Sequence, residues 1–514
     1  MENKIEKALM NRRVSFLAMI LFFVPGILSA IVLTDYRSTK EPVSYNDFLN
    51  LVEKIKNSEK LEWTVEYIGE SSGGRPIVAI KYSSPFHVDN HTIAFIGLQH
   101  GDEPAGKDAL IYLINNLYSG SEKIPSDTSI LFIPAINPDG FEGKKRENDA
   151  GADLNRDHQI LSQPETQALH YEITNFQPDI VVDCHEFSKD PKGYAEKGWY
   201  KHPDIMLDTA NNPYFSDLLY AEGGRWIKVM ENAFALSPHK FSQYFVGGPP
   251  PEKEIRPSTL EMDDARNSLA AEGRLSFLIE SGRFLNSDDP YSDLPARIDA
   301  YILILREFLY NTKEIVRSRE AVIKANSNTL PELIPVNCFW GRTSGEVKKH
   351  TVFDKKTGRT INVSAANIMN ERILKKFVPT PKGYIIDPCL AEAMKTLLSR
   401  HSIRFYQFSK ALPVKLEKYK MIRIEKEPDD IYNRYEDRQI VEICRASWYK
   451  VPENSLYVPV KETNDIPAVL LLECSQLYGI LTSEMMKNFA QPGKILPISR
   501  AIVLPSAISQ KIFQ

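Results

Sequence analysis

Two histidines and one glutamate have the residue types and positions needed to hold a metal ion. His100 and Glu103 lie three positions apart in the motif HGDE, at the end of an apolar run. An imidazole and a carboxylate at that spacing can converge on one point and bind zinc. His185, in the run DIVVDCHEF, is a third candidate ligand. Three protein ligands leave the fourth position to water, as a catalytic zinc site requires, so we expect one Zn²⁺ ion here.

Four further side chains have chemistry that fits such a site. Glu280 follows the apolar run SFLI, and a carboxylate near a metal-bound water can accept its proton. Asn155 and Arg156 are adjacent in DLNR and suit capture of a substrate carboxylate. Arg146 is another cation, after the turn AINPDG. Taken singly, each also has an ordinary structural interpretation, as a solvated glutamate or a helix-entry ion pair.

The elements that must position these residues alternate between apolar strands and helices. Such alternation predicts an α/β fold, with a sheet covered on both faces and its chemistry at the carboxyl ends of the strands. Strands are expected at 91–99, 128–137, 179–187 and 274–282, a hairpin around Gly73-Gly74, and helices at 45–60, from near Glu103 through Tyr118, at 164–176 and at 299–325.

The order of the motifs resembles the zinc carboxypeptidase family, over about residues 45–315. The matching features are HGDE, NPDGF, an arginine, DLNR, a strand ending in Asp-x-His and FLIES. The resemblance implies a mixed, mostly parallel, twisted sheet between helices. It also implies that His100, Glu103 and His185 are the zinc ligands and that Glu280 is the general base. Arg146 would stabilise the oxyanion, and the pair Asn155 and Arg156 would bind the terminal carboxylate of the substrate.

The chain departs from the family at the substrate side chain pocket. Many members carry a tyrosine about 22 residues before the general base, where this chain has Ser258, and Tyr244 is the nearest upstream candidate. Arg266, in the run DDARNS, resembles an arginine of bacterial members and is a candidate for the pocket that receives the terminal side chain. A cation there would favour an acidic group. The alternative is a structural ion pair with Asp263 or Asp264.

The N-terminus predicts export. Residues 14–34 form a run of 21 residues without a charge, and about 20 are needed to cross a bilayer. Lys4, Lys7, Arg12 and Arg13 precede the run, which keeps the N-terminus cytoplasmic and sends the rest outward. Residues 1–34 are therefore a signal peptide, with a candidate cleavage site at Leu28-Ser29-Ala30, or a membrane anchor. We expect a periplasmic, membrane-anchored or secreted protein.

Composition limits the remaining possibilities. The 514 residues are 43% hydrophobic and 25% charged, which excludes a disordered or collagen-like chain. The net charge of −4 offers no general attraction to nucleic acid, so we expect no nucleic-acid partner. We predict a catalytic domain at 45–325 and a C-terminal accessory domain, α/β or β-rich, at 330–514. Cys184 is expected to face the core, and the other four cysteines leave one or two disulfides open.

These observations predict a zinc-dependent metallocarboxypeptidase that acts on peptides with a free C-terminal carboxylate. Peptidoglycan stem peptides are one candidate substrate class. Two alternatives stay open. Aspartoacylase-like amidohydrolases, which act on N-acyl amino acids, share the arrangement of an HxxE motif, an Asn-Arg pair and a later histidine. A homologue that binds peptide ends without hydrolysing them is the other. The oligomeric state does not follow from the sequence.

Overall fold

The structure is a computed structural model that describes most of the chain after residue 34. The described residues are 35–85, 90–214, 217–271, 273–285, 288–325, 330–342, 348–429, 434–475 and 479–504. Residues 35–514 form one compact unit. The predicted export segment lies outside the described residues, so it stays a prediction. Within the described part of the chain, no helix has both the length and the apolar character needed to cross a membrane.

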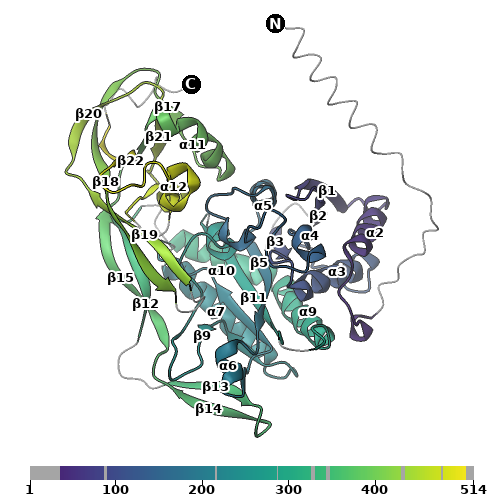
Figure 1. Cartoon of the computed structure of the whole chain (residues 1–514). Helices are drawn as coiled ribbons and strands as arrows, with labels where there is room; N and C mark the ends of the chain where they lie inside the picture. The colour runs from purple at the N-terminus through teal and green to yellow at the C-terminus, as the bar shows by residue number, and fades with distance from the viewer. Residues whose placement is uncertain are drawn as a thin grey trace. The chain divides into compact units, whose positions relative to one another are not determined.

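An eight-stranded mixed sheet forms the centre of the N-terminal part (Figure 1). Its central strand pairs β4–β3, β3–β5 and β5–β11 are parallel, whereas β1–β2, β2–β4 and β11–β7 are antiparallel. This confirms the expected mixed α/β class. In order across the sheet the strands are β1 (Trp63–Glu70), β2 (Pro76–Tyr82), β4 (Thr128–Ile133), β3 (His91–Gly97), β5 (Ile180–Ser188), β11 (Leu275–Arg283), β7 (Ile205–Thr209) and β8 (Phe241–Gln243).

Helices cover both faces of this sheet, which explains why its central strands are continuously apolar. On one face, α3 (Pro104–Ser119) packs on β3 and β5, and α9 (Leu294–Tyr310) packs on α3 and β11. On the other face, α5 (Pro164–Phe176) and α8 (Ala265–Ala270) cover a buried cluster that includes Ile96, Leu169 and Val181. Alternation along β5 sends Cys184 to the α3 face, where its side chain packs against Gly106, and leaves His185 on the α8 face.

The expected long helix at 299–325 is wrong in its continuity. The structure has two helices there, α9 and α10 (Thr312–Ala325), with Asn311 between them as the C-cap of α9. The side-chain amide of Asn311 donates to the Glu307 carbonyl, and the hydroxyl of Thr312 donates to the Phe308 carbonyl. These side chains satisfy carbonyl groups that the end of a helix leaves without partners, so the break costs little. Hydrophobic spacing alone carries no signal for such a break.

The C-terminal part is rich in strands, as expected. Its main sheet packs against α11 (Pro388–Arg400) and α12 (Ile466–Leu472). The strands of the sheet are β17 (Tyr406–Gln407), β21 (Leu456–Pro459), β16 (Gly383–Ile386), β22 (Ile495–Val503), β18 (Leu412–Asp429) and β19 (Arg434–Ile443), with β20 (Ser447–Val451) paired to β18.

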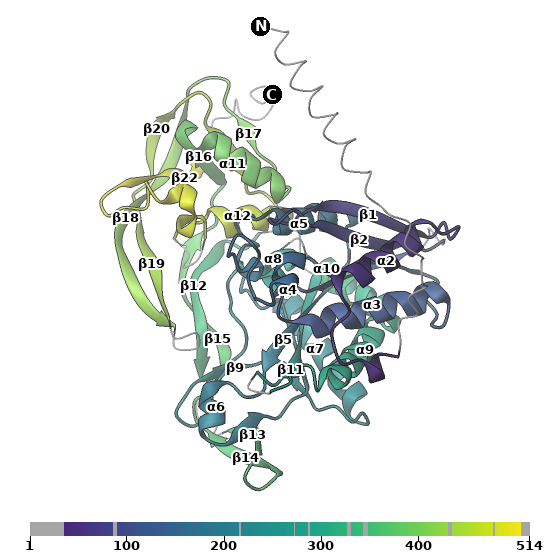
Figure 2. The same ribbon diagram turned by 45° about the vertical axis from the view of Figure 1, so that its right-hand side comes forward.

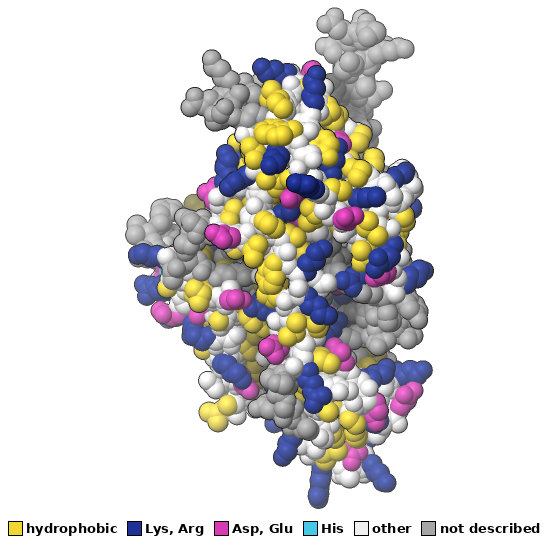
Figure 3. All heavy atoms as spheres, turned by 90° about the vertical axis from the view of Figure 1, so that its left-hand side faces the viewer, with side chains coloured by type: hydrophobic (Ala, Val, Ile, Leu, Met, Phe, Trp, Pro, Cys, Tyr) yellow, Lys and Arg dark blue, Asp and Glu magenta, His cyan; other side chains and the backbone are white. Residues whose placement is uncertain are grey.

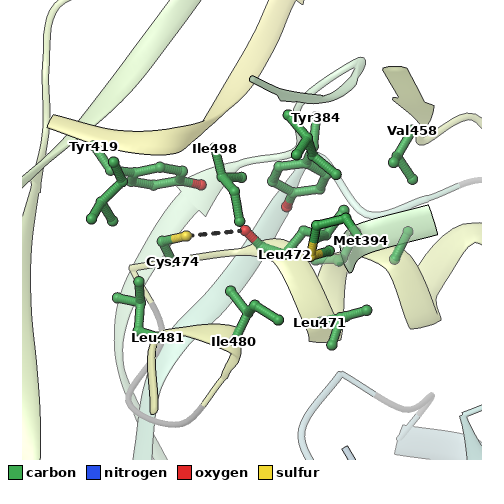
Figure 4. Close-up of a cluster of buried hydrophobic side chains, with 14 of the residues drawn as sticks. Tyr384, Met394, Tyr419, Val458, Leu471, Leu472, Cys474, Ile480, Leu481 and Ile498 are labelled. Atoms are coloured by element: carbon green, nitrogen blue, oxygen red, sulfur yellow. Dashed lines mark hydrogen bonds between the residues drawn. The ribbon is translucent and has the colours of Figure 1, made fainter. Parts of the chain in front are cut away.

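A hydrophobic core lies between this sheet and its helices (Figure 4). One carboxylate, Glu473, is fully buried beside it and accepts hydrogen bonds from Tyr384 and Tyr419 at 3.1 and 2.7 Å. The guanidinium of Arg500 lies 3.3 Å away. A buried charge costs free energy unless it is paired and hydrogen-bonded, and Glu473 is both. All five cysteines are free, so the disulfides left open by the sequence do not form in this structure.

The C-terminal part contacts the N-terminal part at several places. The strand β6 (Trp199–Lys201) pairs with β13 (Lys348–Asp354), and β13 pairs with β14 (Arg359–Ala365). The indole of Trp340, in β12 (Leu333–Arg342), donates to the Ser258 carbonyl at 2.8 Å. Near α12, Leu470 packs in a buried cluster with residues of the N-terminal part. Hydrogen bonds, a shared sheet and shared apolar packing therefore join the two predicted domains.

The outer side of the C-terminal sheets mixes apolar and basic side chains. Figure 3 shows this side, where β12, β15 (Met369–Pro379) and β18 lie in Figure 1. Large exposed apolar side chains on these strands and on β20 include Phe377, Ile424 and Trp448. Lysine and arginine side chains lie between the apolar ones, and such charges reduce the tendency of exposed strands to associate.

Candidate metal and catalytic site

Consecutive strand ends bring the predicted site residues together at one edge of the sheet. His100 and Glu103 lie between β3 and α3, where Glu103 is the N-cap and Pro104 begins the helix. His185 and Glu280 lie near the carboxyl ends of β5 and β11 and are directly paired in the register of these parallel strands. These four side chains thus lie at the edge of the sheet where the sequence analysis expected the chemistry to collect, and their roles stay predictions.

His100, Glu103 and His185 form a buried group of donor atoms, hereafter the donor triad. Their ligand atoms all lie within 4.8 Å of one another. Nδ1 of His100 is 3.0 Å from Nδ1 of His185, and the two Glu103 oxygens are each 3.0 Å from one of these nitrogens. Two imidazole nitrogens and a carboxylate that converge in this way fit the donor preference of zinc. The triad therefore provides the residues to hold one Zn²⁺ ion.

Asp153 and Arg146 orient the first histidine. One oxygen of Asp153 is 3.2 Å from Nε2 of His100, and the other accepts from Nε of Arg146 at 3.0 Å. Burial would raise the pKa of Asp153, but the His100 hydrogen bond and the nearby positive charges hold it well below its usual range. Nη1 of Arg146 lies 3.1 Å from Nδ1 of His100, so this guanidinium reaches the triad. The sequence identified Arg146, whereas the contact of Asp153 with His100 was not predicted.

The NPDGF motif holds these segments together. The Asn137 side chain donates to the carbonyls of Gln99 and Arg146 at 3.0 and 3.2 Å and accepts from the Gly140 amide at 2.9 Å. Gly101 of HGDE approaches the same turn so closely that a Cβ atom there would lie 1.9 Å from the Gly140 carbonyl carbon. Only glycine fits at Gly101, because the two motifs meet backbone to backbone.

Glu280 has the environment of a general base. It is 8% exposed, and its Oε2 atom is buried without a hydrogen-bond partner within the described residues. Burial and the negative charge of Glu103 raise the pKa of Glu280 to about 7. A carboxyl group with a pKa near neutrality can both accept and return a proton. The orphaned oxygen also fits a water or metal-bound ligand at this place.

Asn155 and Arg156 lie together at the edge of the triad. The Asn155 amide nitrogen is 3.2 Å from Nε2 of His185, and its oxygen accepts from the Ala265 backbone at 2.9 Å. Arg156 remains 24% exposed at its side chain and lies 3.7 Å from Asp263. The structure thus brings both predicted carboxylate-binding residues to the site, with Arg156 accessible from solvent.

Arg266 is held in a network of its own. It is 1% exposed, donates to Asp264 at 2.7 Å and to the carbonyls of Thr209 and Thr259 at 2.8 and 2.9 Å, and lies 3.8 Å from Asp208. This geometry favours the structural alternative for Arg266, because two carboxylates already compensate its charge. Tyr244 is half-buried on the loop after β8. Their roles in a specificity pocket stay predictions.

A chain of hydrogen bonds behind His185 was not predicted. Asp183 accepts from Nε2 of His185 at 2.9 Å and from the Gln99 amide at 2.7 Å. The Gln99 oxygen accepts from Nε2 of His158 at 2.6 Å, and Nδ1 of His158 is 3.0 Å from Nε2 of His170. A proton on Nε2 of His185 leaves its Nδ1 lone pair free for a metal. No spacing pattern in the sequence marked Gln99, His158 or His170.

The fold and the site narrow the class of protein. The donor triad of two histidines and a glutamate lies at the carboxyl edge of a mixed α/β sheet, beside an orphaned glutamate, and its donor set fits zinc. Residues 48–190 match the family model "Zinc carboxypeptidase", and this segment contains the whole triad. This segment of the chain is thus similar to the zinc carboxypeptidase family. Glu280 lies beyond the matched segment and is placed in the site by strand pairing.

Individual relatives match over part of the chain. Carboxypeptidase 2 of Trichophyton rubrum is 30% identical over 116 residues, which are 22% of each chain. Carboxypeptidase 2 of Trichophyton tonsurans is 22% identical over 316 residues, 58% of this chain and 56% of the relative. The chain therefore spans between about a fifth and somewhat more than half of these relatives. Among solved structures, carboxypeptidase A of Helicoverpa armigera covers 56% of this chain and 75% of its own, with 16% identity and a TM-score of 0.40.

Proposed function

We propose that the protein is a zinc-dependent metallocarboxypeptidase that removes C-terminal residues from peptides. The observation that carries this proposal is the orphaned Oε2 atom of Glu280 beside the donor triad of His100, Glu103 and His185. When bound by the triad, zinc supplies Lewis acidity that polarises the scissile carbonyl and lowers the pKa of water. The family match over residues 48–190 supports the same assignment.

The chain's own residues have distinct tasks in the reaction. Glu280 accepts the proton of the attacking water and returns it to the leaving amine, which its pKa of about 7 allows. Arg146 donates hydrogen bonds to the developing oxyanion, and each such donor contributes about 3–4 kcal/mol of transition-state stabilisation. Asn155 and Arg156 bind the terminal carboxylate of the substrate, because an amide and a guanidinium together offer several N–H donors.

The test compares four kinds of substrate. A peptide with a free C-terminus should be hydrolysed, the same peptide with a C-terminal amide should not, and turnover should require zinc. Hydrolysis of N-acyl amino acids alone would favour the amidohydrolase alternative, and peptide binding without hydrolysis would favour the inactive binding homologue. Purified peptidoglycan stem peptides belong in the same panel, since they carry free carboxylates.

The Glu280→Gln variant tests the proposed general base. We expect turnover to fall by a factor of about 10²–10⁴ while zinc content is retained, because the donor triad is unchanged. Glu252→Gln is the matched control, since Glu252 is an exposed glutamate that forms an ion pair with Lys197, away from the donor triad. Full activity of Glu280→Gln would remove Glu280 from the mechanism.

For the proposed export, N-terminal sequencing of protein purified from cells would show whether residues 1–34 are removed.

A further inference from the structure

Lys201 is a buried lysine at the catalytic edge of the sheet that the mechanism does not use. It ends β6 and is 7% exposed. Its backbone amide donates to the Lys189 carbonyl at 2.7 Å, and the Lys189 amide donates to the Arg283 carbonyl at 2.8 Å. Lys189 follows β5 and Arg283 ends β11. Lys201 therefore lies just beyond the carboxyl ends of the two strands that carry His185 and Glu280.

Aromatic side chains surround the ammonium group of Lys201. Its Nζ atom lies 5.4, 6.0 and 5.1 Å from the ring centroids of Phe187, Tyr194 and Phe245. His350 closes this group, with Nε2 3.0 Å from the Tyr194 hydroxyl and its ring 4.9 Å from that of Phe245. We call Phe187, Tyr194, Phe245 and His350 the aromatic cage.

The C-terminal part of the chain contributes to this cage. His350 belongs to β13, which pairs with β6 across the predicted domain boundary. Figures 1 and 2 show α6 (Lys192–Glu196), β9 (Val246–Gly247) and β13 together near the end of β11. The cage is thus complete only when the C-terminal part is in place.

Among the described residues, no carboxylate forms an ion pair with Lys201. Neighbouring lysines are paired, Lys189 with Asp204 at 2.6 Å and Lys197 with Glu252 at 2.8 Å. In the part of the chain that the structure describes, no oxygen accepts a hydrogen bond from the Lys201 ammonium group. Burial lowers the pKa of Lys201 to about 8, and the charge of Glu280 opposes that effect. Aromatic faces stabilise a cation by a few kcal/mol at most, so an anion that pairs with the Lys201 ammonium group would stabilise this buried charge further.

Along β11, the link to α8 comes before Glu280 and the link to Lys201 comes after it. The Arg266 side chain of α8 donates to the carbonyl of Thr209, and Thr209 pairs with Phe277 of β11. Phe277 precedes Glu280 in that strand. Backbone hydrogen bonds through Lys189 link Lys201 to Arg283, and Arg283 follows Glu280 in the same strand. Asn155, proposed to bind the terminal carboxylate, contacts the start of α8. A peptide anchored there would extend past Glu280 toward Lys201 with the residue that precedes the scissile bond.

We propose that Lys201 and the aromatic cage form a subsite for an acidic side chain on the penultimate residue of the substrate. This inference rests on the proposed carboxypeptidase function and names the substrate class that it prefers. The ammonium group supplies the charge, and the surrounding rings exclude water, which strengthens the pairing.

The test uses two peptides that differ only in glutamate or glutamine at the penultimate position. With wild-type protein carrying zinc, we expect kcat/KM to be about tenfold or more higher for the glutamate peptide, the range of a hydrogen bond to a charged group. Lys201→Met should abolish this preference, and Lys201→Arg should retain it. Lys197→Met removes a paired lysine nearby and should leave the ratio unchanged.

A binding measurement separates this inference from the proposed function. In the Glu280→Gln background, isothermal titration calorimetry should give a lower Kd for the glutamate peptide, and adding Lys201→Met should make the two Kd values equal. Equal rates for the two peptides in the wild type, or the same ratio in Lys201→Met, would overturn the subsite. Hydrolysis of neither peptide would overturn the proposed function, and the titration would still decide whether Lys201 binds the acidic group.

Discussion

Replacing Glu280 by glutamine should stabilise the metal-free protein in a pH-dependent way. Burial and the neighbouring Glu103 charge raise the Glu280 pKa from its ordinary value of 4.5 to about 7. Because the folded-state pKa is the higher one, the folded protein retains a proton between these values that the unfolded chain has lost. Above pH 7, folding must therefore accommodate an ionised carboxylate in a buried site, and stability falls as the pH rises through this window.

The size of the effect follows from the shift. At about 1.4 kcal/mol per pKa unit, a change from 4.5 to about 7 corresponds to about 3 kcal/mol. Glutamine has nearly the same shape and does not ionise. Glu280→Gln should thus raise the free energy of unfolding by about 3 kcal/mol at about pH 8 and by less than about 1 kcal/mol at about pH 5.

The assay is urea denaturation of both proteins in the presence of a chelator at these two pH values. Groups distant from Glu280 titrate equally in both proteins, so the difference between them reports on Glu280 and on the charges that interact with it. Glu252→Gln is again the control and should show no such difference. A Glu280→Gln difference that is the same at both pH values would refute the assignment of a raised pKa to Glu280.

Three further changes test the supporting structure. Arg266→Met should lower the free energy of unfolding by about 3–5 kcal/mol, because Asp264 and Asp208 would be left buried without a counter-charge. A loss of activity at wild-type stability would instead support a role of Arg266 in the pocket for the substrate side chain. Asp183→Asn should weaken zinc affinity about 10–100-fold in a chelator competition assay, because Asp183 orients His185. Wild-type zinc affinity in this variant would contradict the orienting role of Asp183. Leu470→Ala should lower the free energy of unfolding by about 2–5 kcal/mol in denaturant titrations, because it opens a cavity between the two parts of the chain. An unchanged unfolding transition would mean that the packing of Leu470 contributes little to stability.

Local sequence signals were sufficient for most elements near the site. The hairpin around Gly74 forms between β1 and β2, with Gly74 at a positive φ of 82°. The predicted strands at 179–187 and 274–282 correspond to β5 and β11, because strands covered on both faces are apolar throughout. The break at Asn311 was missed because it depends on side-chain hydrogen bonds to individual carbonyls, which hydrophobic spacing does not record.

The candidate ligands could be identified for a similar reason. His100, Glu103 and His185 occur in short motifs at strand ends, so their types and order along the chain already indicate a metal site. Lys201 and His158 carry no such local pattern. Their roles depend on what lies beside them, such as the rings around Lys201 or the Gln99 oxygen at 2.6 Å from His158.

The sequence by itself determined the class of site, since donor types at strand ends depend only on local order along the chain. It also determined the α/β alternation of the N-terminal part, because burial on both faces of a sheet requires continuous apolar runs. Only the tertiary structure decided that Glu280 lies beside His185, that Asp264 and Asp208 compensate Arg266, and that a strand from the C-terminal part closes the cage around Lys201. These are contacts between residues far apart in the chain, and they arise from strand pairing and packing, which no single segment encodes.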